Sequence, residues 1–299
     1  MRKQFCMILF RFVVLFGILA PNLVHAKEQI DVYVQNFPPF HILEGDYKNT
    51  GVLDYIAQQV SSDLKSDFNF NFREANFARF FKDARNGRAV CSFAIRKTKA
   101  RAEFMDFSIP FALSLGNGLV VGPHIRELIN GFQNENGEVN LREIHKSINL
   151  TYWSETARSY EAAIEEIVKD KTLIDSGVVQ TYSSREALAG VLKNLTRSAK
   201  NAHFAYAEEV SYHSAVSGIE KGLSYFRVMD ESEDYSMAHL ACSKGDWNDK
   251  FIVAANKIFR DMRTSETLKQ AHMRWLPENI HQQYSQMVDQ AFDNLNDEH

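Results

Sequence analysis

The sequence has little that would hold the protein in a membrane or on a nucleic acid. After residue 26, no stretch approaches the roughly 20 consecutive apolar residues that a membrane-spanning helix needs. The 34 lysine and arginine residues are outnumbered by 38 aspartate and glutamate residues, which gives a formal net charge of −4. Basic residues gather at one place, between Arg96 and Arg101, and form no stripe. The sequence therefore predicts no nucleic-acid partner.

The common short motifs of enzymes and metal sites are also missing. There is no G-x-S-x-G, no phosphate-binding Walker pattern and no H-E-x-x-H, the spacing that places two histidines on a zinc ion. The acidic stretches GDWND and DESED lack the alternation of a calcium-binding loop. We therefore expect no catalytic residue, no metal and no other cofactor.

The N-terminus differs from the rest of the chain. Residues 1–3 carry positive charge, residues 5–20 are almost wholly apolar apart from Arg11, and Ala26 offers a small residue for cleavage. This pattern predicts a secretory signal peptide over residues 1–26 and export to the periplasm. A membrane anchor is the alternative, but the apolar run is short and contains a charge.

Cysteine is scarce. Cys6 lies in the predicted leader, in surroundings that do not fit a lipoprotein cleavage site, so the exported chain keeps Cys91 and Cys242. In an oxidising compartment these two residues are a candidate disulfide, with two free thiols as the alternative.

The chain after residue 26 alternates strand and helix patterns. Such alternation predicts an α/β fold with mostly parallel sheets covered by helices. The length exceeds what one small core usually needs, so two lobes are expected. Strands are predicted over residues 29–36, 67–74, 89–95, 115–122, 148–153, 177–182, 202–207 and 237–244, and helices over 52–64, 76–87, 141–147, 159–170, 184–195, 247–276 (two helices) and 278–295.

The basic residues follow directly after the buried strand 89–95. Ligands of open α/β sheets bind at the carboxyl ends of strands, which is where Thr98 and Arg101 fall. A guanidinium offers a planar fork of donors that matches a carboxylate. We therefore expect Arg101 to anchor an anionic group, with Thr98 forming a hydrogen bond beside it. A solvent-exposed Arg101 is the alternative.

A second anion-friendly place is predicted in the later half. The stretch SETARSY places Arg158 and Ser159 at the expected start of a helix, where exposed N–H groups and the positive helix end favour negative charge. Helix capping is the alternative role for Ser154 and Thr156 in the same stretch.

Four stretches together resemble the extracellular solute-binding proteins of family 3, the polar-amino-acid binding proteins of ABC importers. They are NFPPF (36–40), KTKARAEFMDFSIPF (97–111), AHFAYAEE (202–209) and the segment from Leu240 to Leu276. The resemblance implies a two-lobe periplasmic-binding-protein-like fold of type II, with two crossover strands as a hinge. Lobe one would cover residues 27–115 and 237–276, lobe two residues 116–236, and residues 277–299 would be a helical extension.

The resemblance also assigns roles to single residues. Phe37 corresponds to an aromatic residue that covers the ligand, with ordinary core packing as the alternative. Glu208 corresponds to the carboxylate that receives an α-ammonium group, with an exposed glutamate at a helix start as the alternative. It places Cys91 and Cys242 on strands of one lobe, where a bridge can form. One departure is Arg96-Lys97, where amino-acid binders have small hydroxyl residues. An inward Arg96 favours a more anionic ligand, and an outward Arg96 leaves the amino-acid interpretation intact.

The resemblance implies a monomer that binds a small anionic or zwitterionic molecule, an amino acid or a related carboxylate, and is read by an ABC permease or a membrane sensor. Two rivals stay open. One is a secreted, dehydratase-like enzyme on the same fold, with Glu208 or Glu155 as acid or base and Arg101 as the substrate clamp. The other is a sensory or interaction module without a ligand.

Overall fold

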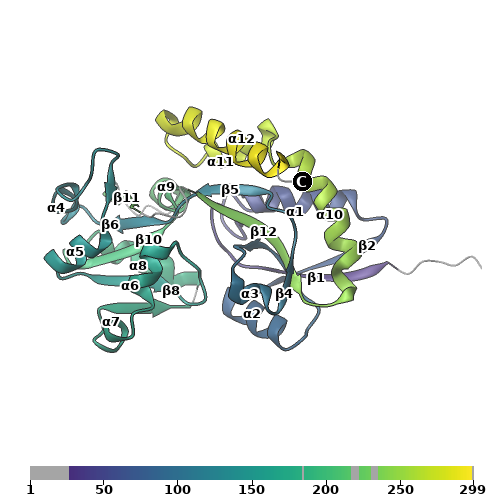
Figure 1. Cartoon of the computed structure of the whole chain (residues 1–299), viewed down its shortest axis with the longest axis horizontal. Helices are drawn as coiled ribbons and strands as arrows, with labels where there is room; N and C mark the ends of the chain where they lie inside the picture. Colours follow the sequence, from purple (N-terminus) through teal and green to yellow (C-terminus); the bar gives the residue numbers. More distant parts are fainter. Residues whose placement is uncertain (1–26, 184, 217–221, 230–234, 298–299) are drawn as a thin grey trace, which may run out of the picture.

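The computed structural model describes residues 27–183, 185–216, 222–229 and 235–297. The predicted signal peptide, residues 1–26, lies outside these residues. The described part forms two mixed α/β sheets, each with its own helices, which lie side by side in Figure 1. We name the two bodies the first lobe and the second lobe.

The first lobe contains the sheet nearest the N-terminus. Its strand order is β2 (Phe68–Glu74), β1 (Glu28–Val34), β3 (Cys91–Ile95), β12 (Tyr235–Ser243) and β4 (Met105–Phe107), and β5 (Ala112–Leu115) pairs with β12. Its helices are α1 (Val52–Asp63), α2 (Phe77–Arg85), α3 (Lys99–Ala102), α10 (Asp249–Met262) and α11 (Glu266–Met273). The apolar spacing that predicted α1 is confirmed, because Val52, Ile56 and Val60 are all buried in the core of this lobe.

The second lobe contains the other sheet. Its strand order is β7 (Glu138–Val139), β11 (Ser224–Val228), β6 (Gly118–Val121), β10 (Asn201–Ala205), β8 (Thr151–Glu155) and β9 (Val179–Tyr182). Its helices are α4 (Arg126–Asn130), α5 (Leu141–Ser147), α6 (Ala162–Val168), α7 (Lys171–Asp175), α8 (Arg185–Leu195) and α9 (Ala207–Val216). Its core includes the stacked rings of Tyr152 and Phe204.

The α/β class and the two-lobe architecture are confirmed, but the sheets are less parallel than expected. Strand β12 runs antiparallel to β3, β4 and β5, and β6 runs antiparallel to β10 and β11. The cause is the hinge: the chain leaves the first lobe after β5 and returns through β12, and these crossover strands pair as neighbours. A strand that returns from another lobe need not share the direction of the strands it joins.

The predicted disulfide is present. Cys91 on β3 lies directly opposite Cys242 on the antiparallel strand β12, their Cα atoms are 4.0 Å apart, and both residues are fully buried. The bond therefore ties the returning strand to the centre of the first sheet, across a sequence separation of 151 residues.

Replacing both cysteines, Cys91→Ala with Cys242→Ala, should lower the free energy of unfolding by about 2–4 kcal/mol, because the bond constrains a long loop in the unfolded chain. Guanidinium denaturation of the oxidised protein and the variant measures the difference. Reduction of the wild-type protein is the matched control and should give a similar loss. Equal stability of all three samples would contradict a stabilising bridge.

A last helix, α12 (His281–Asp297), follows the short 3-10 turn Glu278–Ile280. The Tyr284 hydroxyl donates to the carbonyl of Leu113 on β5 at 2.7 Å, and Lys269 of α11 pairs with Asp289 at 2.6 Å. Helix α12 therefore packs on the hinge strand and on α11, and in Figure 1 it extends from the first lobe toward α9 of the second. Within the described ranges, no helix has both the length and the apolarity to cross a membrane.

Candidate functional site

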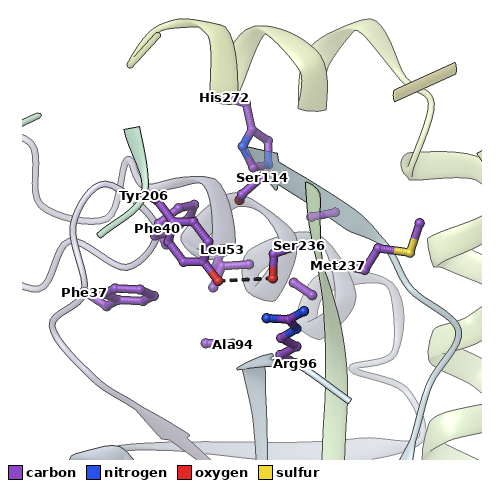
Figure 2. A pocket seen from close by; sticks show the side chains of 12 residues that line it. Phe37, Phe40, Leu53, Ala94, Arg96, Ser114, Tyr206, Ser236, Met237 and His272 are labelled. Atoms are coloured by element: carbon purple, nitrogen blue, oxygen red, sulfur yellow. Dashed lines mark hydrogen bonds between the residues drawn. The ribbon is translucent and has the colours of Figure 1, made fainter. Parts of the chain in front are cut away.

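Two small cavities, each about 40 Å³, lie where the lobes meet. Both are lined by Phe37, Ala94, Arg96 and Tyr206. Figure 2 shows the first of them, with the rings of Phe37, Phe40 and Tyr206 on one side and Arg96 and Ser236 on another. The second is lined in addition by Phe77, Phe81, Ile95, Arg101, Arg158 and Ser159. Five of the residues predicted from the sequence, Phe37, Arg96, Arg101, Arg158 and Ser159, therefore lie around one small space.

Arg101 points from the first lobe toward the second. Thr98 caps α3, since its hydroxyl accepts a hydrogen bond from the Arg101 N–H at 3.2 Å. The Arg101 guanidinium donates to the carbonyl of Arg96 at 2.8 Å and, across the interlobe space, to the carbonyl of Ala157 at 2.9 Å. It also lies 4.4 Å from the centre of the Phe81 ring. Thr98 thus acts on the backbone and helps to hold Arg101 in place.

The Arg101 charge is poorly compensated. Its partners are backbone carbonyls, and among the described residues no carboxylate forms an ion pair with it. Burial lowers the pKa of Arg101 to about 10, although the group remains protonated at neutral pH. A partly buried cation in this state favours an anionic partner, because an opposite charge offsets the hydration that it has lost.

Arg96 also points inward, but its positive charge is paired with a carboxylate. Its guanidinium forms an ion pair with Glu161 of the second lobe at 3.2 Å. Glu161 is buried and also accepts a hydrogen bond from Asn117 at 3.0 Å. Of the two orientations considered for Arg96, the structure shows the inward one. Glu161 neutralises the extra positive charge that an inward Arg96 adds to the site.

Arg158 is the best-paired cation of the site. It donates to Glu209 at 2.6 and 3.2 Å and to Asn117 at 2.6 Å, and its guanidinium lies 4.7 Å from the Tyr206 ring and 5.3 Å from the Phe37 ring. Burial alone would lower the pKa of Arg158, but the charge and hydrogen bonds of Glu209, together with the nearby Tyr160 and Tyr206, outweigh burial and raise the pKa. Arg158 is thus held as a cation against the aromatic wall of the site.

The local structure around Arg158 differs from the prediction. Ser154 lies in β8, α6 begins only at Ala162, and Arg158 and Ser159 belong to the loop between them. The strand continues further than predicted because the backbone of Glu155 pairs with that of Tyr182 in the neighbouring strand β9. Helix N-terminal groups therefore do not surround Arg158.

The acidic residue beside Arg158 is Glu209, and Glu208 lies elsewhere. Both residues are completely buried in the first turn of α9. Glu209 binds Arg158 and also accepts from the backbone N–H of Tyr206 at 2.9 Å, whereas a Glu208 oxygen lies 3.9 Å from Nδ1 of His272. Glu208 lines neither of the two cavities.

Several contacts join the lobes across the site. In addition to the bonds of Arg96 and Arg101, Gln35 of the first lobe donates to Glu155 of the second at 2.7 Å, and the ring of Tyr206 packs on those of Phe37 and Phe40. The lobes are therefore closed on each other. A space of about 40 Å³ holds a few water molecules or a small polar group, so a whole solute enters only when the lobes separate.

Sequence reasoning did not find Gln35, Glu161, Tyr206 or Glu209. Gln35 directly follows the last residue of β1, and its side-chain oxygen accepts a hydrogen bond from the Phe77 N–H at 2.7 Å. This bond joins the end of β1 to the start of α2. Tyr206 lies between β10 and α9, a strand end of the kind that drew attention to Arg101. The same criterion, a polar or aromatic residue directly after a buried strand, would have found Tyr206.

A buried histidine of the second lobe gives a pH-dependent expectation. Burial lowers the pKa of His203 to about 4 from 6.5, although its hydrogen bond to the Trp153 carbonyl opposes this. Between these pH values the unfolded chain binds a proton that the native protein does not, so stability is lost as the pH falls below 6.5. One such group steepens the loss by up to about 1.4 kcal/mol per pH unit.

His203→Gln should therefore make the stability of the protein less sensitive to pH between about pH 6.5 and about pH 4. Urea denaturation at a series of pH values measures the slope. A variant with the wild-type slope would show that His203 is not held neutral in the native protein.

Two α/β lobes, a pair of crossover strands and a buried, partly cationic site between the lobes define the class of two-lobed ligand-binding proteins. The chain matches the bacterial extracellular solute-binding proteins, family 3, over residues 30–278, and it belongs to that family. The family predicted from the four sequence stretches is thereby confirmed.

Solved structures agree on the fold. A Streptococcus pneumoniae amino acid ABC transporter substrate-binding protein bound to L-arginine shares 16% identity with this chain, covers 83% of this chain and 93% of its own, and superposes with a TM-score of 0.61. A Streptococcus mutans protein from a study of glutathione import by GshT and a cystine ABC importer has 14% identity, coverage of 86% and 100%, and a TM-score of 0.62.

A domain of a different kind is also similar. The VFT2 domain of Bordetella pertussis BvgS has 17% identity, covers 83% of this chain and 93% of its own, and has a TM-score of 0.55. At these identities the structural comparisons establish the type II periplasmic-binding-protein-like fold, and they do not transfer a ligand. A comparison with curated protein sequences found no match.

Proposed function

We propose that this protein is a periplasmic solute-binding protein that captures a small carboxylate, an amino acid or a related anion, between its two lobes. The observation that carries the proposal is Arg101. Its partly buried guanidinium faces the second lobe and has backbone carbonyls as its partners. A carboxylate is the natural counter-ion for such a group, because two of its oxygens can accept from the planar fork.

The charges of the neighbouring residues limit the ligand. Glu161 pairs with Arg96, and Glu209 and Glu155 pair with Arg158, so among the arginines of the described site Arg101 is the one without a carboxylate partner. One such guanidinium suits one carboxylate group. A zwitterion or a monoanion therefore fits better than the more highly charged ligand that Arg96-Lys97 alone would favour.

The aromatic wall suits the body of such a solute. The rings of Phe37 and Tyr206 lie 6.5 Å apart and border both cavities. When the lobes separate, the contacts of Arg101 with Ala157 and of Gln35 with Glu155 would break, and both Arg101 and Gln35 would become available to a ligand. A ligand that binds both lobes shifts the population back to the closed form.

The closed form is the state that a membrane partner would recognise and bind. Similar structures include substrate-binding proteins of ABC transporters and a histidine kinase sensor domain, so the partner of this protein would be an importer or a membrane sensor. Residues 1–26 would direct export and be removed, leaving a periplasmic monomer.

The positions of the acidic residues support binding over catalysis. Glu155 and Glu208, the acid–base candidates of a dehydratase-like enzyme, line neither cavity. Burial raises the pKa of Glu155 against the opposing pull of Arg158, but its carboxylate accepts from Gln35 and is already engaged between the lobes. A substrate held by Arg101 would lack an acid or base beside it.

Native mass spectrometry of protein purified without denaturation tests the proposal. We expect an adduct of one small carboxylate-bearing molecule, which is released on unfolding and, added back at about 100 times its dissociation constant, stabilises the protein by about 2.7 kcal/mol. The proposal would be wrong if no adduct is found and no member of a panel of amino acids and small carboxylates raises the melting temperature.

A further inference from the structure

A larger cavity lies away from the interlobe site. Its volume is about 510 Å³, and it lies between α9 and β11 of the second lobe and the C-terminal helix α12. This volume is within the range of sites for small organic molecules. The described residues that line it include Leu115, Ala207, Val210, Ser211, Ser214, Leu223, Tyr225, Arg227, Pro277, Ile280, Gln283, Tyr284 and Met287.

Two helices line this cavity, each with one face. On α9 the lining residues Ala207, Val210, Ser211 and Ser214 recur at the spacing of one helical face. On α12 and the turn before it, residues 280, 283, 284 and 287 follow the same spacing. Figure 1 shows α12 extending toward α9. Two regular helix faces thus meet at a space that neither fills.

The walls of the cavity are largely apolar. The hydroxyls of Tyr225 and Tyr284 are used elsewhere, since they donate to the carbonyls of Gly116 at 2.6 Å and Leu113 at 2.7 Å, so both rings offer mainly carbon. Arg227 is paired with Glu138 at 3.1 Å. None of the described lining residues is a carboxylate. The neutral polar groups are Ser211, Ser214 and Gln283.

We propose that this cavity is a second ligand site, for a neutral and mainly apolar small molecule that carries one hydrogen-bonding group. The cavity opens to solvent at Ser214, Pro277 and Gln283, which are exposed, and an apolar molecule that enters it removes apolar wall surface from water. The apolar body would lie against Val210, Tyr225 and Met287, and its polar group would bond to the hydroxyls of α9 or the amide of Gln283.

This site is separate in space from the proposed solute site. Glu209, on another face of α9, binds Arg158 at the interlobe cavities, whereas residues 207, 210, 211 and 214 line the larger one. All of α12, which begins at His281, also lies beyond residue 278, where the match to the family ends. The second site is therefore built by joining a C-terminal extension to the family fold.

The neutral fluorescent probe N-phenyl-1-naphthylamine tests the proposal with the full exported chain. We expect saturable fluorescence enhancement with one probe bound per protein. Gln283→Trp and Ser211→Phe, which fill the cavity from its two helical walls, should each weaken binding at least tenfold. Gln282→Trp and Ala215→Phe, at exposed neighbouring positions that do not line the cavity, are the matched controls and should bind as the wild type does.

Arg101→Ala separates the two sites, and it should leave probe binding unchanged. The proposal is overturned if the probe does not saturate, if the filling variants bind it as tightly as their controls while keeping a wild-type circular dichroism spectrum, or if Arg101→Ala removes binding. The last result would place the probe between the lobes.

Discussion

Replacing Arg101 with alanine is expected to weaken solute binding by about 2–5 kcal/mol, which corresponds to a factor between about 30 and several thousand in the dissociation constant. The reason is that the solute carboxylate would be desolvated between the lobes without the cation that faces it. Calorimetric titration of the wild type and the variant with the solute that copurifies measures the loss.

Two further variants sharpen this test. Arg101→Lys keeps the positive charge but not the planar fork, so it should fall between the wild type and alanine. Lys99→Ala removes an exposed cation from the same short helix and should change affinity little. Wild-type affinity in Arg101→Ala would remove Arg101 from the site, and an equal loss in Lys99→Ala would show that general charge acts instead of a specific contact.

The second large effect concerns stability. Glu209→Ala leaves the Arg158 guanidinium buried without its main carboxylate, and we expect the free energy of unfolding to fall by about 3–5 kcal/mol. Side chains of Arg158 and Glu209 are only 5% and 1% exposed, so water cannot replace the lost partner. Denaturant unfolding monitored by tryptophan fluorescence measures the change.

An exposed ion pair in the same lobe provides the control. Arg142 and Glu166 approach within 2.6 Å, but their side chains are 69% and 50% exposed, so Glu166→Ala should cost no more than about 1 kcal/mol. Adding Arg158→Leu to Glu209→Ala should recover part of the loss, because no unpaired charge is then buried. Equal effects of Glu209→Ala and Glu166→Ala would contradict the assignment of Arg158–Glu209 as a buried pair.

Much of the fold could be predicted because its signals are local. The apolar spacing of residues 52–60 predicts α1 from adjacent residues alone, and the basic cluster after β3 identifies a strand end. Phe37, Arg101, Arg158 and Ser159 also line one cavity, as a site between two lobes would require. Their contact with a solute stays a prediction.

The pairing of side chains could not be predicted in the same way. Glu208 and Glu209 are neighbours in sequence, but one residue along a helix turns the side chain by about 100°, which decides between His272 and Arg158. The partner of Arg96 is Glu161, which comes from the other lobe and is reached only when the lobes close. Such pairs depend on the relative position of two folded bodies, and no local pattern encodes it.

A crystal structure of the protein with its copurified solute tests the role of Arg101. We expect a carboxylate of the solute between the lobes, with its oxygens about 2.7–2.9 Å from the Arg101 guanidinium nitrogens. A solute bound between the lobes through other residues, with Arg101 still bonded only to the backbone of Arg96 and Ala157, would contradict it.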